Sequence, residues 1–103
     1  MTEQQKIAIE KYRKEFQDNC KSYSAWGSAR DCNFRLYKSE NPEDENYTMV
    51  ITSITGLSDD FQTYVETINL MVEPDGNVLN LTDVYAQSQV VTYIQQLKLV
   101  DNG

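Results

Sequence analysis

Apolar residues recur at steps of three and four through the first part of the chain, which is the spacing of one face of a helix. The recurring residues are Ile9, Tyr12, Phe16, Cys20 and Tyr23. Polar and charged side chains occupy most of the other positions. The pattern predicts an amphipathic helix of about twenty residues whose apolar stripe faces the core.

The polar face of this helix alternates in charge. Lys6, Glu10, Lys14 and Asp18 follow one another at intervals of four residues. Opposite charges at this spacing are neighbours on a helix surface and support it weakly. We therefore interpret the face as solvated, because a helix that binds nucleic acid would carry a single sign of charge.

The helical spacing fails at the run "SYSAWGSARD", where serines and Gly27 predict a loop. Trp26 lies within it and has two interpretations. It can cover the end of the core, as large aromatic side chains often do, or it can be an exposed anchor for a partner. We place the core interpretation first.

Two runs then alternate apolar and polar residues, "CNFRLYK" at 32–38 and "NYTMVITSI" at 46–54. Both are rich in residues that favour strands, and they predict an antiparallel pair. The connection at 39–45 contains Pro42 and four acids, so it must be exposed. The acids are Glu40, Glu43, Asp44 and Glu45. This loop is interpreted as a solvated hairpin tip or as a negative projection that meets a basic partner.

The run "TGLSDDFQTYVE" at 55–66 resembles a helix start, because Ser58 is followed by Asp59 and Asp60. Phe61, Val65 and Ile68 keep helical spacing, so a short helical turn is expected here. From Ile68 onwards the residues alternate again, which predicts a third strand.

The run "VEPDGNV" at 72–78 has the composition of a tight hairpin turn. Pro74 fixes the first turn angle, Asp75 suits the second position, and Gly76 can adopt the left-handed conformation that a three-residue hairpin with a bulge needs. A fourth strand should follow. Turn chemistry explains each residue, so we interpret the turn as a corner of the sheet and not as a binding site.

The run "SQVVTYIQQLKLV" at 88–100 predicts a second helix. Ser88 is a natural N-cap, Ile94 and Leu97 continue an apolar stripe from Val90 or Val91, and Lys98 suits the last turn. The expected fold is α+β, with a four-stranded antiparallel sheet, an N-terminal helix and a C-terminal helix. Both helices are expected on one face of the sheet.

A chain of 103 residues corresponds to one domain, here 1–103. Its apolar share of 40% can form a core without disulfides. No apolar run approaches the roughly 18 residues of a membrane span, and the first sixteen residues are too polar for a signal peptide. These features predict a cytoplasmic protein without a membrane contact. Cys20 and Cys32 are then expected to be reduced, with a disulfide between them as the alternative.

Charge is divided unequally along the chain. Residues 1–38 carry eight basic side chains and five acidic ones, whereas residues 39–103 carry only Lys98 against eleven acids. Such asymmetry is a hint of an electrostatic partner. The alternative is that the chain folds back, so that its acidic part neutralises its basic helix.

The sequence contains no histidine, which is the commonest general base and a frequent zinc ligand. Two cysteines alone cannot complete a structural zinc site, and no glycine-rich phosphate loop occurs. We therefore expect neither enzymatic activity nor a metal or cofactor.

Binding to another protein is the leading hypothesis. The excess of acid predicts a small inhibitor, immunity protein or phage-type antagonist, of the anti-CRISPR or anti-restriction kind, that docks on a basic surface of a nucleic-acid-handling enzyme. The candidate contact residues are Glu40, Glu43, Asp44, Glu45, Asp59, Asp60 and Trp26. The alternative is a homodimeric adaptor or secretion-type chaperone. A helix–sheet RNA-binding domain ranks third, since the net charge of −7 disfavours direct contact with nucleic acid.

Overall fold

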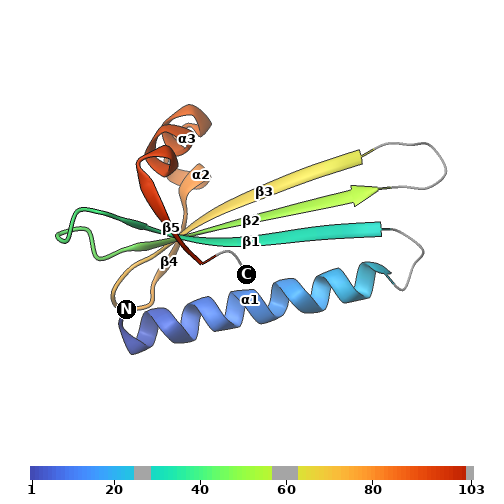
Figure 1. Cartoon of the computed structure of the whole chain (residues 1–103), viewed down its shortest axis with the longest axis horizontal. Coiled ribbons are helices and arrows are strands. Elements are labelled where there is room, and N and C mark those ends of the chain that lie inside the picture. The colour runs from blue at the N-terminus through green and yellow to red at the C-terminus, as the bar shows by residue number, and fades with distance from the viewer. Residues whose placement is uncertain (25–28, 57–62, 102–103) are drawn as a thin grey trace.

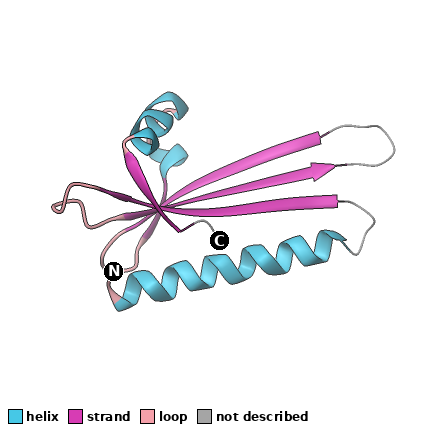
Figure 2. Ribbon diagram, in the orientation of Figure 1, coloured by secondary structure: helices cyan, strands magenta, loops and turns pink. Residues whose placement is uncertain are grey.

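The chain forms an antiparallel sheet with helices on both of its faces (Figures 1 and 2). The computed structural model describes residues 1–24, 29–56 and 63–101, and the side chains of 1–18, 33–52 and 67–101. The elements are α1 (Glu3–Ser24), β1 (Ala29–Ser39), β2 (Tyr47–Gly56), β3 (Thr63–Val72), β4 (Val78–Asn80), α2 (Leu81–Val84), α3 (Gln87–Gln95) and β5 (Leu97–Asp101). The α+β class and the terminal helices agree with the sequence-based prediction.

Within the described residues the sheet has five strands in the order β4-β3-β2-β1-β5, one more than predicted. Neighbouring strands are antiparallel throughout. The predicted β1–β2 pair is confirmed, and its register places Leu36 beside Met49, which in turn lies beside Leu70. Because paired residues point to the same face, these three apolar positions form one row across the sheet.

The main core lies between this row and α1. Its buried members are Ile9, Phe34, Leu36, Met49, Ile51, Leu70 and Val72. Tyr12 and Phe16 of α1 pack against them, so the predicted apolar stripe is confirmed for the positions whose side chains are described. Cys20, Tyr23 and Cys32 have side chains outside the described set.

The start of α1 is a capping box. The hydroxyl of Thr2 accepts a hydrogen bond from the backbone N–H of Gln5 at 3.1 Å, and the side-chain oxygen of Gln5 accepts one from the backbone N–H of Thr2 at 2.9 Å. This reciprocal pair satisfies two donors that a helix start otherwise leaves free. Gln5 is only 1% exposed, and its amide donates to the Val72 carbonyl of β3.

The helices do not share one face, contrary to the sequence-based expectation. Met71 pairs with Thr48 and Leu79, a set that points away from α1 because side chains alternate along strands. Met71 lines the same hollow as Val90 and Tyr93 of α3. The C-terminal helices therefore cover the face opposite α1, as Figure 1 shows.

The predicted C-terminal helix is too long. α3 begins at Gln87 after the N-cap residue Ala86, and it ends at Gln95. Ser88 lies inside the helix and is not its cap; instead, the Ala86 backbone N–H donates to Oε1 of Gln89 at 3.0 Å. Lys98 belongs to β5, whose pairing with residues 36–39 of β1 satisfies backbone groups that a longer helix would have left on the sheet edge.

A short helical turn was predicted after Ser58, but the residues from Thr63 onwards form a strand. β3 begins at Thr63, so Val65 and Ile68 are strand residues despite their helical spacing. Pairing along the whole length of β2 outweighs that weak local signal. Residues 57–62, including Asp59 and Asp60, lie outside the described part of the chain, as does Trp26.

The predicted hairpin turn between β3 and β4 is confirmed. Gly76 has a φ of +89°, and its N–H donates to the Glu73 carbonyl at 2.9 Å. The turn also touches α1, because the Thr2 hydroxyl donates to the Pro74 carbonyl at 2.6 Å. The predicted fourth strand, β4, ends at Asn80, and α2 begins at Leu81.

Candidate protein-binding surface

The acidic loop, defined as residues 40–46 between β1 and β2, is built from local turns. The side-chain oxygen of Asn41 accepts a hydrogen bond from the Glu43 N–H at 3.0 Å, and Oδ1 of Asp44 accepts one from the Asn46 N–H at 3.1 Å. Short Asn and Asp side chains stabilise turns in this way. These two bonds stabilise the turns of the loop.

Three side chains attach the acidic loop to the rest of the protein. Nε2 of Gln5 donates to the Glu45 carbonyl at 2.8 Å and also to the Val72 carbonyl of β3 at 3.2 Å. Lys38 Nζ donates to the Asp44 carbonyl. The Tyr93 phenol donates to Oδ2 of Asp44 at 3.3 Å. Contacts from α1, β1 and α3 thus converge on Asp44 and Glu45.

The carboxylates of the acidic loop have different environments. Glu40, Glu43 and Glu45 are exposed, while Asp44 is half-buried and bonded to Tyr93. Of the predicted contact residues, the structure brings these four together and leaves Asp59, Asp60 and Trp26 undescribed. Asp44 holds the loop in place, and the three glutamates face solvent.

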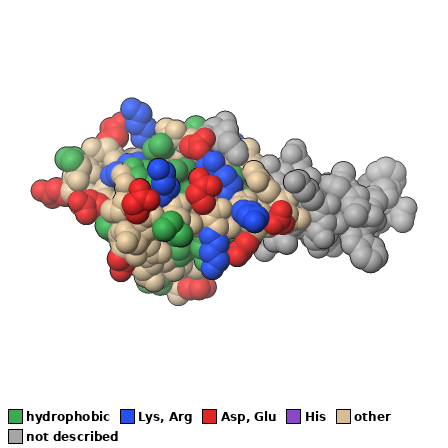
Figure 3. Space-filling model, turned by 90° about the horizontal axis from the view of Figure 1, so that it is seen from below, with side chains coloured by type: hydrophobic (Ala, Val, Ile, Leu, Met, Phe, Trp, Pro, Cys, Tyr) green, Lys and Arg blue, Asp and Glu red, His purple; other side chains and the backbone are tan. Residues whose placement is uncertain are grey.

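Basic side chains of α1 do not neutralise this loop in the described part of the chain. The ion pair found there joins Arg13 to Asp101 of β5 at 2.7 Å. Arg13 also lies over the Phe34 ring, 4.6 Å from its centre. Figure 3, which looks onto α1, shows basic and acidic side chains interspersed, in agreement with the alternation predicted for that helix.

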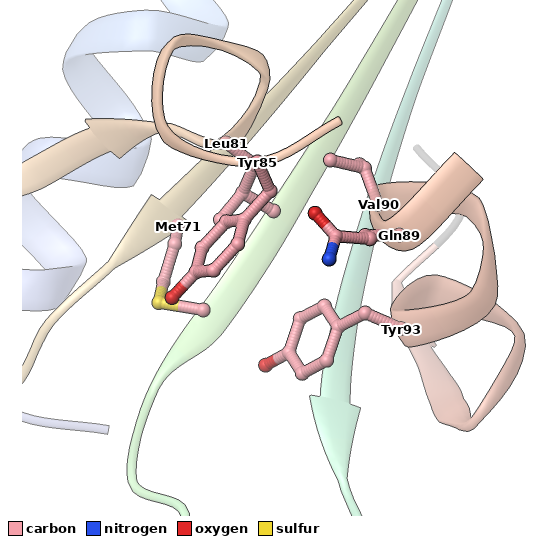
Figure 4. A pocket seen from close by; sticks show the side chains of 6 residues that line it. All are labelled: Met71, Leu81, Tyr85, Gln89, Val90 and Tyr93. Atoms are coloured by element: carbon pink, nitrogen blue, oxygen red, sulfur yellow. The ribbon is translucent and has the colours of Figure 1, made fainter. Parts of the chain in front are cut away.

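An apolar hollow lies on the opposite face of the sheet. The α3 hollow, as we call it, has a volume of about 330 Å³. Its lining residues are Met71, Leu81, Tyr85, Gln89, Val90 and Tyr93. Figure 4 shows Met71 of β3, Leu81 of α2 and Tyr85, the residue after α2, on one side and the α3 side chains on the other. None of the six is charged.

Tyr93 joins the α3 hollow to the acidic loop. Its ring lines the hollow, and its phenol oxygen binds Asp44. Burial raises the pKa of the Tyr93 phenol above its ordinary value of 10.0, and the negative charge of Asp44 raises this pKa further. The nearby Thr48 hydroxyl lowers the pKa of this phenol. The same hydroxyl is buried and has no partner at strict hydrogen-bonding geometry.

The described residues also form two shallower hollows. One is lined by Ser88, Gln89, Thr92, Tyr93 and Gln96, and it shares Gln89 and Tyr93 with the α3 hollow. The other lies on the exposed face of α1 and is lined by Lys6, Ile7, Glu10, Lys11 and Lys14. The first continues the α3 hollow with polar side chains. The second mixes both signs of charge.

Sequence reasoning missed the α3 hollow because its parts come from three elements. The signal for α2 was present in "NLT", where Asn80 can cap a helix, and its Oδ1 indeed accepts from the Thr82 N–H at 3.2 Å. Tyr85 and Tyr93 had no assigned role. Only the position of α3 opposite Met71 of β3 reveals that both tyrosines line one opening.

Comparison of the chain with protein-family models, with curated proteins and with solved structures gave no significant match. Within the described ranges, no three Cys, Asp or Glu side chains are close enough together to hold a metal ion. No helix in those ranges is both long enough and apolar enough to cross a lipid bilayer. The function of the surface formed by the acidic loop and the α3 hollow is therefore inferred from its exposed carboxylates and its uncharged lining.

Proposed function

We propose that this protein binds another protein and that its acidic loop docks on a basic surface of that partner. The observation that carries the proposal is the attachment of the loop by Gln5, Lys38 and Tyr93, which leaves the carboxylates of Glu40, Glu43 and Glu45 exposed. A loop that is ordered before binding loses less conformational entropy on association than a free one. Its negative charge accelerates encounter with a basic partner.

The class of partner that best fits is an enzyme that handles nucleic acid, because such enzymes carry basic clefts for phosphate. Occupying such a cleft would make this protein an inhibitor or antagonist. The net charge of −7 supports binding to a basic partner and disfavours direct binding of RNA or DNA.

Affinity capture from a lysate of the source cell tests the proposal. The wild type is compared with a variant carrying Glu40→Gln, Glu43→Gln and Glu45→Gln. A matched control carries Glu3→Gln, Glu10→Gln and Glu15→Gln, which removes the same number of charges from α1. Each is washed at about 0.1 M and then about 1 M salt, since the screening length falls from about 10 Å to about 3 Å.

We expect the wild type and the control to retain a basic protein that high salt releases, and the loop variant to lose it. The captured protein is then assayed for nuclease or nucleic-acid-binding activity with and without the purified acidic protein. Equal retention by the loop variant would contradict the proposal. Recovery of only a second copy of the chain and salt-resistant apolar clients would instead favour an adaptor or chaperone.

A further inference from the structure

The α3 hollow has the size and chemistry of a site for one apolar side chain. Small ligand pockets in proteins begin at about 300 Å³, and this hollow has a volume of about 330 Å³. Leu81 and Val90 are buried at its base, with exposed fractions of 1% and 2%. Tyr85 also lines the hollow and is 49% exposed, so the hollow meets solvent beside this ring.

The hollow next to it suits a polypeptide backbone. Ser88, Gln89, Thr92 and Gln96 present hydroxyl and amide groups along α3, beside the apolar lining. A bound peptide needs partners for its backbone N–H and C=O groups as well as a place for its side chain. Amide side chains supply both donors and acceptors. The two hollows share Gln89 and Tyr93, so one short extended segment can occupy both.

The position of the acidic loop determines the charge of that segment. Tyr93 contacts the hollow with its ring and Asp44 with its phenol, so Asp44, which Glu43 and Glu45 flank in the chain, lies one tyrosine side chain from the hollow. An extended chain advances about 3.3–3.6 Å per residue, and a few residues cover this separation. Lys38 and Lys98 are paired on the face of the sheet that α1 covers. On the face that carries the hollow, Arg35 is the exposed basic residue in the described strands.

We propose that the α3 hollow binds a large apolar side chain of an extended segment of the partner protein. A lysine or arginine within about four residues of that side chain pairs with the exposed glutamates of the acidic loop. This inference rests on the function proposed above and adds a second contact to it. The apolar anchor supplies affinity, and the basic residue supplies orientation and salt dependence.

A selection from a random peptide display library tests the inference, because the enriched peptides report directly which side chains the surface binds. Three variants accompany the wild type. Gln89→Trp fills the hollow, and its matched control is Gln95→Trp, which places the same side chain at an exposed position of α3 that lines neither hollow. The triple glutamine variant of Glu40, Glu43 and Glu45 removes the loop charge.

We expect the wild type to enrich peptides that combine a large apolar residue with a nearby lysine or arginine. A synthetic peptide from this set should bind Gln89→Trp at least about tenfold more weakly than wild type, since burial of one such side chain accounts for at least that factor. Gln95→Trp should remain within about threefold of wild type. The triple variant should bind more weakly at low salt, and the difference should shrink at high salt.

Other outcomes overturn the inference and are distinguishable from failure of the proposed function. Enriched peptides that are basic but lack an apolar anchor, and that bind Gln89→Trp normally, would overturn the role of the hollow and leave the acidic loop as the binding site. Apolar peptides that the triple variant binds normally would overturn the role of the loop. Absence of any enriched peptide would overturn the two-contact site, and the lysate capture would then decide on the loop alone.

Discussion

Tyr93 of α3 donates a hydrogen bond to Oδ2 of Asp44, a residue 49 positions earlier in the chain. The bond connects the C-terminal helices to the connection between β1 and β2. It also joins the apolar hollow to the acidic loop, so changes at either residue should affect both the order of the loop and the alkaline stability of the protein.

Removal of the Tyr93 phenol should reduce the loss of stability at high pH. The pKa of this phenol is raised in the folded state, so the unfolded chain loses the proton first, and the corresponding stabilisation is present below pH 10.0 and declines as the pH rises through the higher folded pKa. Urea unfolding of wild type and Tyr93→Phe between about pH 8 and about pH 11 measures the difference. Tyr12→Phe is the control, and an unchanged alkaline slope in Tyr93→Phe would contradict the prediction.

Replacement of Gln5 should destabilise the protein although the residue lies in the first turn of α1. Its amide donates to the carbonyls of Glu45 and Val72, and Gln5→Ala would remove this donor from a buried bond to Val72 and a partly buried bond to Glu45. We expect a loss of about 1–3 kcal/mol in the free energy of unfolding. Gln17→Ala, at an exposed position of α1, should change it by less than about 0.5 kcal/mol. Similar losses for the two variants would show that the amide does not hold the loop.

Replacement of Gly76 should strain both the turn and the start of α1. Its φ of +89° is unfavourable for alanine, and an added Cβ would stand 3.0 Å from Cβ of Gln4. Gly76→Ala should cost at least about 1–2 kcal/mol. Gly76→Asn tolerates the backbone conformation better but keeps the contact with Gln4, so thermal unfolding of both variants separates the two effects. Equal stability of wild type and Gly76→Ala would show that neither the backbone conformation at this position nor the contact with Gln4 limits stability.

The contact between Arg13 and Asp101 should contribute little through charge and more through packing. The pair is partly exposed, with side-chain exposures of 26% and 44%, so Asp101→Asn should cost about 0.2–1 kcal/mol and less at high salt. Arg13→Ala also removes the contact with the Phe34 ring and should cost about 1–2 kcal/mol. Urea unfolding at low and high salt distinguishes the two contributions. A larger effect for Asp101→Asn would reverse this order.

Local pattern alone was sufficient for the first helix, the first two strands and the turn at Gly76. In each case one short segment contains the whole signal: a helical stripe, an alternation of apolar and polar residues, or a turn residue at the required position. The exposure of Glu40, Glu43 and Glu45 also followed from the acidic composition of a proline-containing connection.

Tertiary structure decided what depends on distant partners. The run after Gln96 has helical spacing, yet it forms β5 because an edge of β1 is available for pairing. The face covered by α3 depends on which side of β3 presents Met71, a choice that periodicity within α3 cannot reveal. Asp44 resembled its acidic neighbours in sequence, and only the contact with Tyr93 distinguished it. Sequence therefore determined the elements that local interactions stabilise, and the fold determined the surface where separate elements meet.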